Sequence, residues 1–281
     1  MNKTLKYYFR NKKSLKRKKI LGPFAKGVVY ETENGVISMP VEDLTIGKEL
    51  GFKGKWDMDE INLLLDAVTP SDTIYIVGTH VGTLLVPIAK KVNQVVGYEA
   101  NENTFWFMQM NLCLNKLTNV QLFHKAVGNE KKVVRFYQNS VNTGGSKIKP
   151  VTDSILYNYD QPNEVSVDML PLDAHIKDEG LPKANGIIMD IEGAEYVALQ
   201  GMQKTLSEVR FLYVEFVPHH LQNVADIDVA QFLETIAPHF NQAHFVRNGD
   251  KIAMENTSDE LLSYLESMMN NNKSDDILFS K

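Results

Sequence analysis

The sequence predicts an α/β protein built on a doubly wound, mostly parallel sheet, and three observations carry this prediction. Short apolar runs alternate along the chain with segments of helical periodicity. The runs are apolar on both faces, which is typical of parallel strands buried between two layers of helices. The alternation ends in an antiparallel hairpin instead of a further parallel strand. With 281 residues, of which 43% are hydrophobic, the chain can bury one sizeable core.

A hairpin and a helix are predicted ahead of the alternating region, over residues 21–70. Asn34-Gly35 separates the extended runs 28–33 and 36–39 and supplies the two positive-φ residues of a type I′ turn. Helical spacing of apolar residues then follows over 58–68. We interpret this segment as a lead-in or lid to the main domain.

The alternating region is predicted to form one domain over residues 71–256. Its expected parallel strands are 73–77, 94–98, 120–123, 186–189 and 211–217, with helices over 84–92, over 104–117 and after 195. Runs 131–137 and 164–168 are expected as edge strands that flank a polar loop, 139–160, long enough to suggest a function. A hairpin of 243–247 and 251–255, joined by Asn248-Gly249, closes the domain.

The N-terminal residues 1–20 differ from the rest in charge. They hold nine Lys or Arg and no acidic residue, whereas the whole chain has a net charge of -5, so the remainder is distinctly acidic. Such an arm could bind nucleic acid or anionic lipid. The favoured interpretation is a solvated, flexible arm, because like charges in a run repel one another. The acidic remainder argues against nucleic acid as the main substrate.

The C-terminal residues 257–281 are expected to form an amphipathic helix and a tail. Its apolar positions are Leu261, Leu262, Leu265 and Met268, and we expect this face to dock on the domain or on a second subunit. Cys113 is the chain's one cysteine, no apolar stretch is long enough to span a bilayer, and no secretory signal is evident. These features predict a soluble, cytoplasmic protein.

Candidate ligand-binding residues gather on the loops that follow the predicted strands. In an open α/β sheet, ligands bind outside the carboxyl ends of the strands. Gly78-Thr79-His80-Val81-Gly82 follows the first strand, and its glycines let the backbone approach a ligand closely. Glu99 ends the second strand about 20 residues later, the spacing at which an acid binds ribose hydroxyls. Taken singly, either feature is also explained by a tight turn or a solvated acid.

The most informative segment follows strand 186–189 and reads Asp190-x-Glu192-Gly193-x-Glu195. Helix capping explains one of these acids, but close carboxylates repel unless a cation or a shared proton intervenes. Asp190, Glu192 and Glu215 offer oxygen ligands that suit Mg²⁺. No spacing demands a metal, however, and we expect no essential one. His219-His220, after Pro218, could reach the same edge of the sheet, but the favoured interpretation is a pair of ordinary loop histidines.

The segment Ile188 to Glu195, followed by Leu199-x-Gly201, resembles the hallmark of the FkbM methyltransferase family. Further matches occur in the same order between residues 28 and 256: Asn34-Gly35, Asp43, Trp56, Glu99-Ala100-Asn101, Asn111 to Asn115, Ala126-Val127-Gly128, Gly144-Gly145-Ser146, Leu170 to Asp173 and Tyr213-Val214-Glu215. The resemblance implies a Rossmann-like, seven-stranded methyltransferase sheet with helices on both faces and a terminal antiparallel hairpin. It also implies methyl transfer from S-adenosylmethionine to a hydroxyl of a small metabolite, sugar or glycan.

Site residues carried over by this resemblance would surround the cofactor. The set is Val77, Gly78, Thr79, Gly82, Glu99, Ala100, Lys125, Ala126 and Asp190. Gly78 and Gly82 would line the methionine and ribose, Glu99 would hold the ribose hydroxyls, and Lys125-Ala126 would border the adenine. A hydroxyl acceptor must lose a proton. Asp190, beside the reacting methyl, is the preferred base; Glu192 and His80 are alternatives, and His80 is equally well explained as a packing or hydrogen-bonding residue.

Two departures from the family pattern leave other functions open. Ile76 stands where the first loop usually has an Asp, and Ile188 stands where a Lys is common. A degenerate cofactor-binding fold that serves as a non-catalytic binding or assembly subunit is therefore the alternative. An NAD-dependent oxidoreductase is disfavoured, because the first loop lacks a third glycine and the sheet ends in an antiparallel hairpin.

Overall fold

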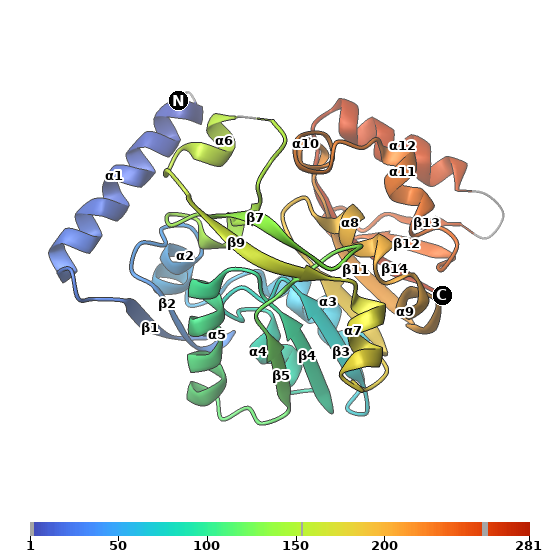
Figure 1. Ribbon diagram of the computed structural model, residues 1–281, viewed down its shortest axis with the longest axis horizontal. Coiled ribbons are helices and arrows are strands. Elements are labelled where there is room, and N and C mark those ends of the chain that lie inside the picture. The colour runs from blue at the N-terminus through green and yellow to red at the C-terminus, as the bar shows by residue number, and fades with distance from the viewer. Residues whose placement is uncertain (1–2, 153, 255–257) are drawn as a thin grey trace.

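The computed structural model describes residues 3–152, 154–254 and 258–281 (Figure 1). The strands are β1 (Gly27–Thr32), β2 (Gly35–Pro40), β3 (Thr73–Val77), β4 (Gln94–Tyr98), β5 (Val120–Phe123), β6 (Ala126–Val127), β7 (Lys132–Gln138), β8 (Lys147–Ile148), β9 (Asn163–Leu170), β10 (Gly186–Met189), β11 (Phe211–Phe216), β12 (Gln242–Phe245), β13 (Lys251–Ala253) and β14 (Asp275–Ser280).

The helices lie between and around these strands. They are α1 (Lys3–Leu21), α2 (Ile46–Lys53), α3 (Met58–Ala67), α4 (Leu85–Ala89), α5 (Glu102–Leu114), α6 (Ile155–Asn158), α7 (Leu172–Asp178), α8 (Glu195–Gln200), α9 (Gln203–Glu208), α10 (Pro218–His220), α11 (Val229–Glu234) and α12 (Asp259–Asn270). Single turns of other helix types occupy Thr143–Gly145 and Leu221–Ala225.

In the described residues the main sheet has eight strands, in the order β13-β12-β14-β11-β10-β3-β4-β5. The five strands from β11 to β5 are parallel, and each begins where the sequence pattern predicts. Side chains alternate between two hydrophobic cores: Tyr75 and Val77 face one, and Ile74 and Ile76 face the other. Helices cover both faces, so the doubly wound α/β prediction is confirmed.

The far end of the sheet differs from the prediction of seven strands that finish in a hairpin. Strand β14 lies between β11 and β12 and is antiparallel to both, so the hairpin β12–β13 does not adjoin the parallel part. This strand belongs to the segment expected as a helix and tail; Ile277 and Phe279 in it are fully buried. A six-residue run gives only a weak local signal, and its partners lie far away in the sequence. The predicted boundary at 256 and the end of the predicted strand 251–255 fall outside the described residues.

The runs 131–137 and 164–168 form strands, but not as edges of the main sheet. They are β7 and β9, which pair antiparallel within a separate four-stranded sheet of order β6-β9-β7-β8. Figure 1 shows this pair crossing the molecule next to the main sheet. The second sheet places the turn Thr143–Gly145 and strand β8 beside the loops that follow β3 and β10.

The predicted type I′ turn at Asn34-Gly35 is wrong, although the hairpin itself is present. Thr32 pairs with Gly35, so Glu33 and Asn34 form the turn, and of the turn and its flanks only Gly35 has positive φ. Asn34 is instead a buried anchor. Its side-chain oxygen accepts from the N–H of Trp56 at 2.9 Å, and its amide donates to the carbonyls of Trp56 and Thr83. The hairpin is thereby tied to the main domain.

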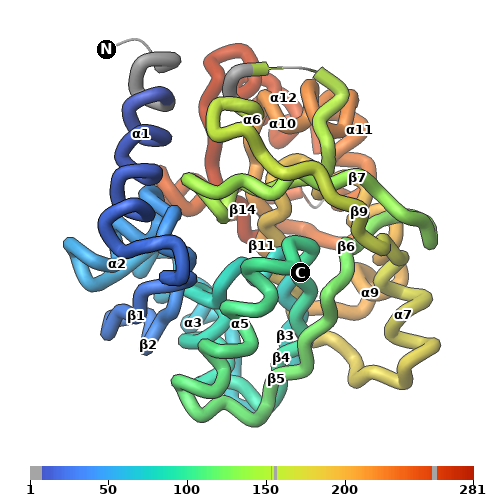
Figure 2. Tube along the Cα trace, turned by 60° about the vertical axis from the view of Figure 1, so that its left-hand side comes forward, coloured from blue at the N-terminus to red at the C-terminus, as the bar shows by residue number. Residues whose placement is uncertain are grey.

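Helices α1 and α12, which lie nearest the two ends of the chain, both contact the main body of the protein. Lys3–Leu21, expected as a flexible arm, forms α1 at the edge of the molecule beside α2 (Figures 1 and 2); residues 1 and 2 lie outside the described part. Within α1, buried Ser14 donates to the carbonyl of Glu42 at 2.6 Å. On α12, Leu261 and Leu265 are buried in the core, as the amphipathic pattern predicts. No helix among the described residues is both long and apolar enough to cross a bilayer.

Candidate functional site

One cavity lies at the carboxyl ends of β3, β4 and β10 and encloses about 1180 Å³, including the space at its open mouth. Residues proposed from the sequence line it, namely Val77, Gly78, Thr79, His80, Glu99, Ala100, Lys125, Ala126 and Asp190. The second sheet contributes further wall through Phe136 and Ile148. The loops that follow neighbouring parallel strands therefore converge, as the topology requires.

Gly78 joins two of these loops. Its φ is +88°, and a Cβ at this position would lie 1.9 Å from the carbonyl oxygen of Asp190. The backbone N–H of Asp190 donates to the carbonyl of Val77 at 3.1 Å. Only glycine allows this approach without displacing the Asp190 loop. The glycine thus sets the distance between the carboxyl end of β3 and the carboxyl end of β10.

Glu99 is held in one orientation at the end of β4. One carboxylate oxygen accepts from the N–H of His80 at 2.6 Å, and the other accepts from the N–H of Asn101 at 2.8 Å. Burial raises the pKa of Glu99, and these backbone hydrogen bonds oppose the rise. Each carboxylate oxygen can accept more than one hydrogen bond. The oxygens can therefore still receive hydroxyl donors from a ligand in the cavity.

A chain of hydrogen bonds orients His80, whose backbone has a positive φ of 49°. The Thr143 hydroxyl donates to Asp43 at 2.7 Å, and Nε2 of His80 lies 2.7 Å from the same hydroxyl. Because the single hydroxyl hydrogen goes to Asp43, Nε2 must donate and Nδ1 must carry a lone pair. Burial lowers the pKa of His80 to about 4, so the ring is neutral at pH 7. Nδ1 has no hydrogen-bond partner among the described residues.

Acidic side chains that the sequence analysis did not select line another part of the cavity. Asp57 and Glu60 come from the start of α3, and Asp276 comes from β14. Glu60 and Asp276 hydrogen-bond to each other, and burial followed by repulsion from Asp276 and Asp57 raises the pKa of Glu60 to about 8. The carboxyl group of Glu60 is therefore mostly protonated at neutral pH. Ile76, which stands where the FkbM sequence pattern usually has an Asp, lines the same cavity.

Asp190 and Glu195 flank the turn between β10 and α8. Asp190 is exposed to the cavity, yet the protein around it removes bulk water, and this desolvation, ahead of repulsion by Glu192 and Glu195, raises its pKa. The side chain of Glu195 accepts from the N–H of Ile191 at 3.0 Å. One of the three acids therefore closes the turn ahead of α8; the N-cap position of this helix is Ala194, and no described side chain caps it, so Glu195 is not the cap that the simpler interpretation proposed.

Two residues predicted for the site lie elsewhere. Gly82 does not line the cavity: a Cβ there would lie 2.4 Å from the sulfur of Met108, so this glycine permits packing against α5. Glu192, with φ +56°, lines a neighbouring pocket instead. Its carboxylate lies 2.9 Å from Nζ of Lys147, a side chain only 6% exposed. Burial alone would raise the pKa of Glu192, but the charge of Lys147 holds it below its usual value.

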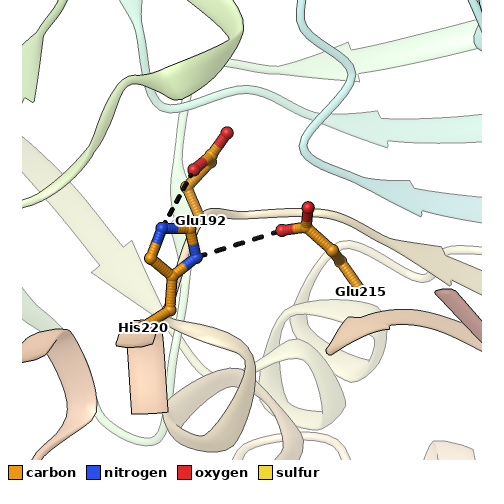
Figure 3. Close-up of side chains that lie close together, drawn as sticks. All are labelled: Glu192, Glu215 and His220. Atoms are coloured by element: carbon orange, nitrogen blue, oxygen red, sulfur yellow. Dashed lines mark ion pairs between the residues drawn. The ribbon is translucent and has the colours of Figure 1, made fainter. Parts of the chain in front are cut away.

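His220 was interpreted from the sequence as an ordinary loop histidine, and this is wrong. It lies buried between two acids (Figure 3): Nε2 is 3.3 Å from Glu192, and Nδ1 is 4.0 Å from Glu215. Burial lowers the pKa of His220 to about 3, so the ring is neutral. The adjacent histidines were visible in the sequence, but nothing local distinguishes the buried one.

Comparison with known proteins gives a family match and a curated relative. Residues 77–268 match the family model of the methyltransferase FkbM domain. The hexuronic acid methyltransferase AglP of Haloferax volcanii is 24% identical over 159 residues, which are 57% of this chain and 62% of that protein. The chain thus spans less than two thirds of this curated relative.

Two solved structures are also similar. The FkbM methyltransferase of Methylobacillus flagellatus KT is 16% identical with a TM-score of 0.45, over 75% of this chain and 44% of that one. The TYW2 protein of M. jannaschii, in complex with AdoMet, is 11% identical with a TM-score of 0.46, over 91% and 85%. The family match extends from the end of β3 into α12 and so covers more than half of the sequence. The chain therefore belongs to the FkbM methyltransferase domain family.

Proposed function

We propose that the protein transfers a methyl group from S-adenosylmethionine to a hydroxyl group of a sugar or another small hydroxylated molecule. The single observation that carries the proposal is the convergence of Gly78, Glu99 and Asp190 on one cavity at the carboxyl edge of the sheet. Family membership supports methyl transfer, and the AglP relative, by its name, acts on a hexuronic acid.

The residues that line the cavity suit the hydrogen-bonding groups and the charge of this donor. Glu99 would accept from the ribose hydroxyls, Ala100 and Lys125-Ala126 would border the adenine, and the backbone at Gly78 and Thr79 would approach the methionine part. The donor carries positive charge on its sulfonium and its amino group, and carboxyl groups line the cavity. We propose that Glu60 and Asp276 supply the acid that Ile76 does not.

Methyl transfer depends mainly on how the protein positions the donor and the acceptor. The donor supplies an activated methyl group on sulfur, and holding the acceptor in line with it provides most of the acceleration. The acceptor hydroxyl must also lose a proton, and a positioned base contributes typically about 10²- to 10⁴-fold. Asp190 remains the proposed base. The lone pair on Nδ1 of His80 is the alternative in the same cavity, while Glu192 lies farther round the turn.

A second pocket beside the cavity would suit a sugar acceptor. Its polar and aromatic lining includes Arg10, Asn142, Lys147, Tyr157 and Glu192. The turn Thr143–Gly145 and the loop after β10 contribute residues to both pockets. Amide, hydroxyl and charged groups of this kind fit the hydroxyls of a sugar ring.

Calorimetric titration with S-adenosylhomocysteine and with NAD tests the donor. We expect the first to bind and the second not to bind; the reverse result would contradict the proposal. Radiolabelled methyl transfer to sugar acceptors then tests the reaction. Binding without transfer to any hydroxylated acceptor would favour the alternative of a non-catalytic subunit, which Ile76 in place of the usual acid motivates.

A further inference from the structure

Glu192, Glu215 and His220 come from three separate elements and meet beside the cavity (Figure 3). Glu192 lies on the turn after β10, Glu215 on β11 and His220 at the end of α10. One ligand atom from each lies within 4.8 Å of the other two. Of the three, His220 is the most deeply buried, with 6% of its surface exposed.

The facing atoms of His220 and Glu215 are unsatisfied. Within the part of the chain that the structure describes, Nδ1 of His220 and Oε2 of Glu215 are both buried without a hydrogen-bond partner, and they lie 4.0 Å apart. Nε2 of His220 lies 3.3 Å from Oε2 of Glu192, and a neutral imidazole with its hydrogen on Nε2 leaves a lone pair on Nδ1. Two buried acceptors that face each other destabilise the fold unless a proton or a metal cation lies between them.

The charges around the cluster favour a cation there. A second group of acids, Asp190, Glu195 and Glu215, has oxygens within 4.8 Å of one another and shares Glu215 with the first. Against these carboxylates, the described ion pairs supply one ammonium, that of Lys147, which bonds Oε2 of Glu192. Among the described ion pairs, the ring of His220 is the remaining partner of Glu192 and of Glu215, and the charge of His219 adds a weaker attraction to Glu192.

We propose that Glu192, Glu215 and His220 bind a divalent cation of the Mn²⁺ or Mg²⁺ class. Two carboxylate oxygens and one imidazole nitrogen suit a hard to borderline ion. Metal–ligand bonds of about 2.1 Å place two ligand atoms between about 3.0 Å (cis) and 4.2 Å (trans) apart, which includes the 4.0 Å between Nδ1 of His220 and Glu215. The limit of 4.8 Å for the set of three requires the side chains to close by about 0.6 Å at most. This site replaces the expectation of no essential metal, because His220 is not recognisable as a ligand from sequence spacing.

The role of the ion rests on the proposed function. Its free positions would take the acceptor's hydroxyl oxygen and lower the pKa of that hydroxyl. Glu215 belongs to both acidic groups and so places the ion next to Asp190. As the oxygen bonds the methyl carbon, the carbon–sulfur bond breaks with its electron pair going to sulfur, and the hydroxyl proton passes to Asp190.

Titration of Mn²⁺ into the full chain tests the site directly, with calorimetry for affinity and electron paramagnetic resonance for bound ion. We expect one Mn²⁺ per chain. Affinity should fall by at least about 10-fold in His220→Gln and in Glu215→Gln. The control Glu164→Gln, on β9 with partners Arg135 and Lys149, should bind Mn²⁺ normally. Circular dichroism confirms that each variant is folded, and Glu192→Gln provides a third ligand variant.

Lys147→Met distinguishes the proposal from its main rival, in which Lys147 is itself the cation of this cluster. Tighter Mn²⁺ binding by this variant than by the unaltered chain agrees with the proposal. Binding by the variant alone, or no binding by either, overturns it. The same samples are titrated with S-adenosylhomocysteine: a chain that binds this ligand but not Mn²⁺ overturns only the metal site. A chain that binds Mn²⁺ but not S-adenosylhomocysteine overturns only the proposed function.

Discussion

Replacing Gly78 by alanine tests whether the close contact between the loops after β3 and β10 holds the cavity in its binding shape. The new Cβ would start 1.9 Å from the carbonyl oxygen of Asp190, whereas ordinary contact begins at 3.4 Å, so the loops must separate by about 1.5 Å. The φ of +88° adds backbone strain of about 1–2 kcal/mol. Relief of the overlap costs about 1–3 kcal/mol more. We expect Gly78→Ala to lose about 2–5 kcal/mol in total.

Gly22→Ala is a matched control. Gly22 has nearly the same φ, +89°, but a Cβ added there would meet no atom within 4 Å, so only the backbone strain applies. At about 3 °C per kcal/mol, thermal unfolding should shift by about 6–15 °C in Gly78→Ala and by at most about 6 °C in Gly22→Ala. Calorimetry should also show that S-adenosylhomocysteine affinity falls at least about 10-fold in Gly78→Ala alone. Equal shifts and equal affinities in the two variants would refute the proposed contact.

Three further predictions address the walls of the cavity. Glu99→Gln should weaken S-adenosylhomocysteine binding by about 1.5–3 kcal/mol, the range for hydrogen bonds to a charged group; calorimetry that finds unchanged affinity would remove Glu99 from the ribose site. Thr143→Val should cost about 1–3 kcal/mol in urea unfolding because it leaves buried polar partners unsatisfied, whereas Thr143→Ser should retain most stability; equal losses would contradict the hydrogen-bond chain to His80. Because the pKa of Glu60 is raised from 4.5 to about 8, the stability that its protonated form contributes is fully present below pH 4.5 and is lost as pH rises to about 8. Glu60→Gln should therefore unfold at a higher temperature than the unaltered chain at pH 9 but not at pH 4; the same difference at both pH values would count against this explanation.

Local patterns were sufficient for the parallel part of the fold. Strands β3, β4, β5 and β10 have the bounds that their apolar runs predict, because burial on both faces leaves a continuous signal in the sequence. The same topology placed Gly78, Glu99 and Asp190 at one edge without any knowledge of side-chain contacts. Positions that depend on contacts were less predictable. Gly82, for example, packs against Met108 and does not reach the cavity.

The sequence by itself determined the fold class, the family and the edge of the sheet where ligands bind, since alternation, turn glycines and the acidic motif are all local in the chain. Tertiary structure alone decided that β14 enters the sheet and brings Asp276 to Glu60, and that His220 lies between Glu192 and Glu215. Glu60 and Asp276, and likewise Glu192 and His220, are far apart in the sequence. Their charge and proton states arise from burial and proximity, which no single segment of the chain encodes.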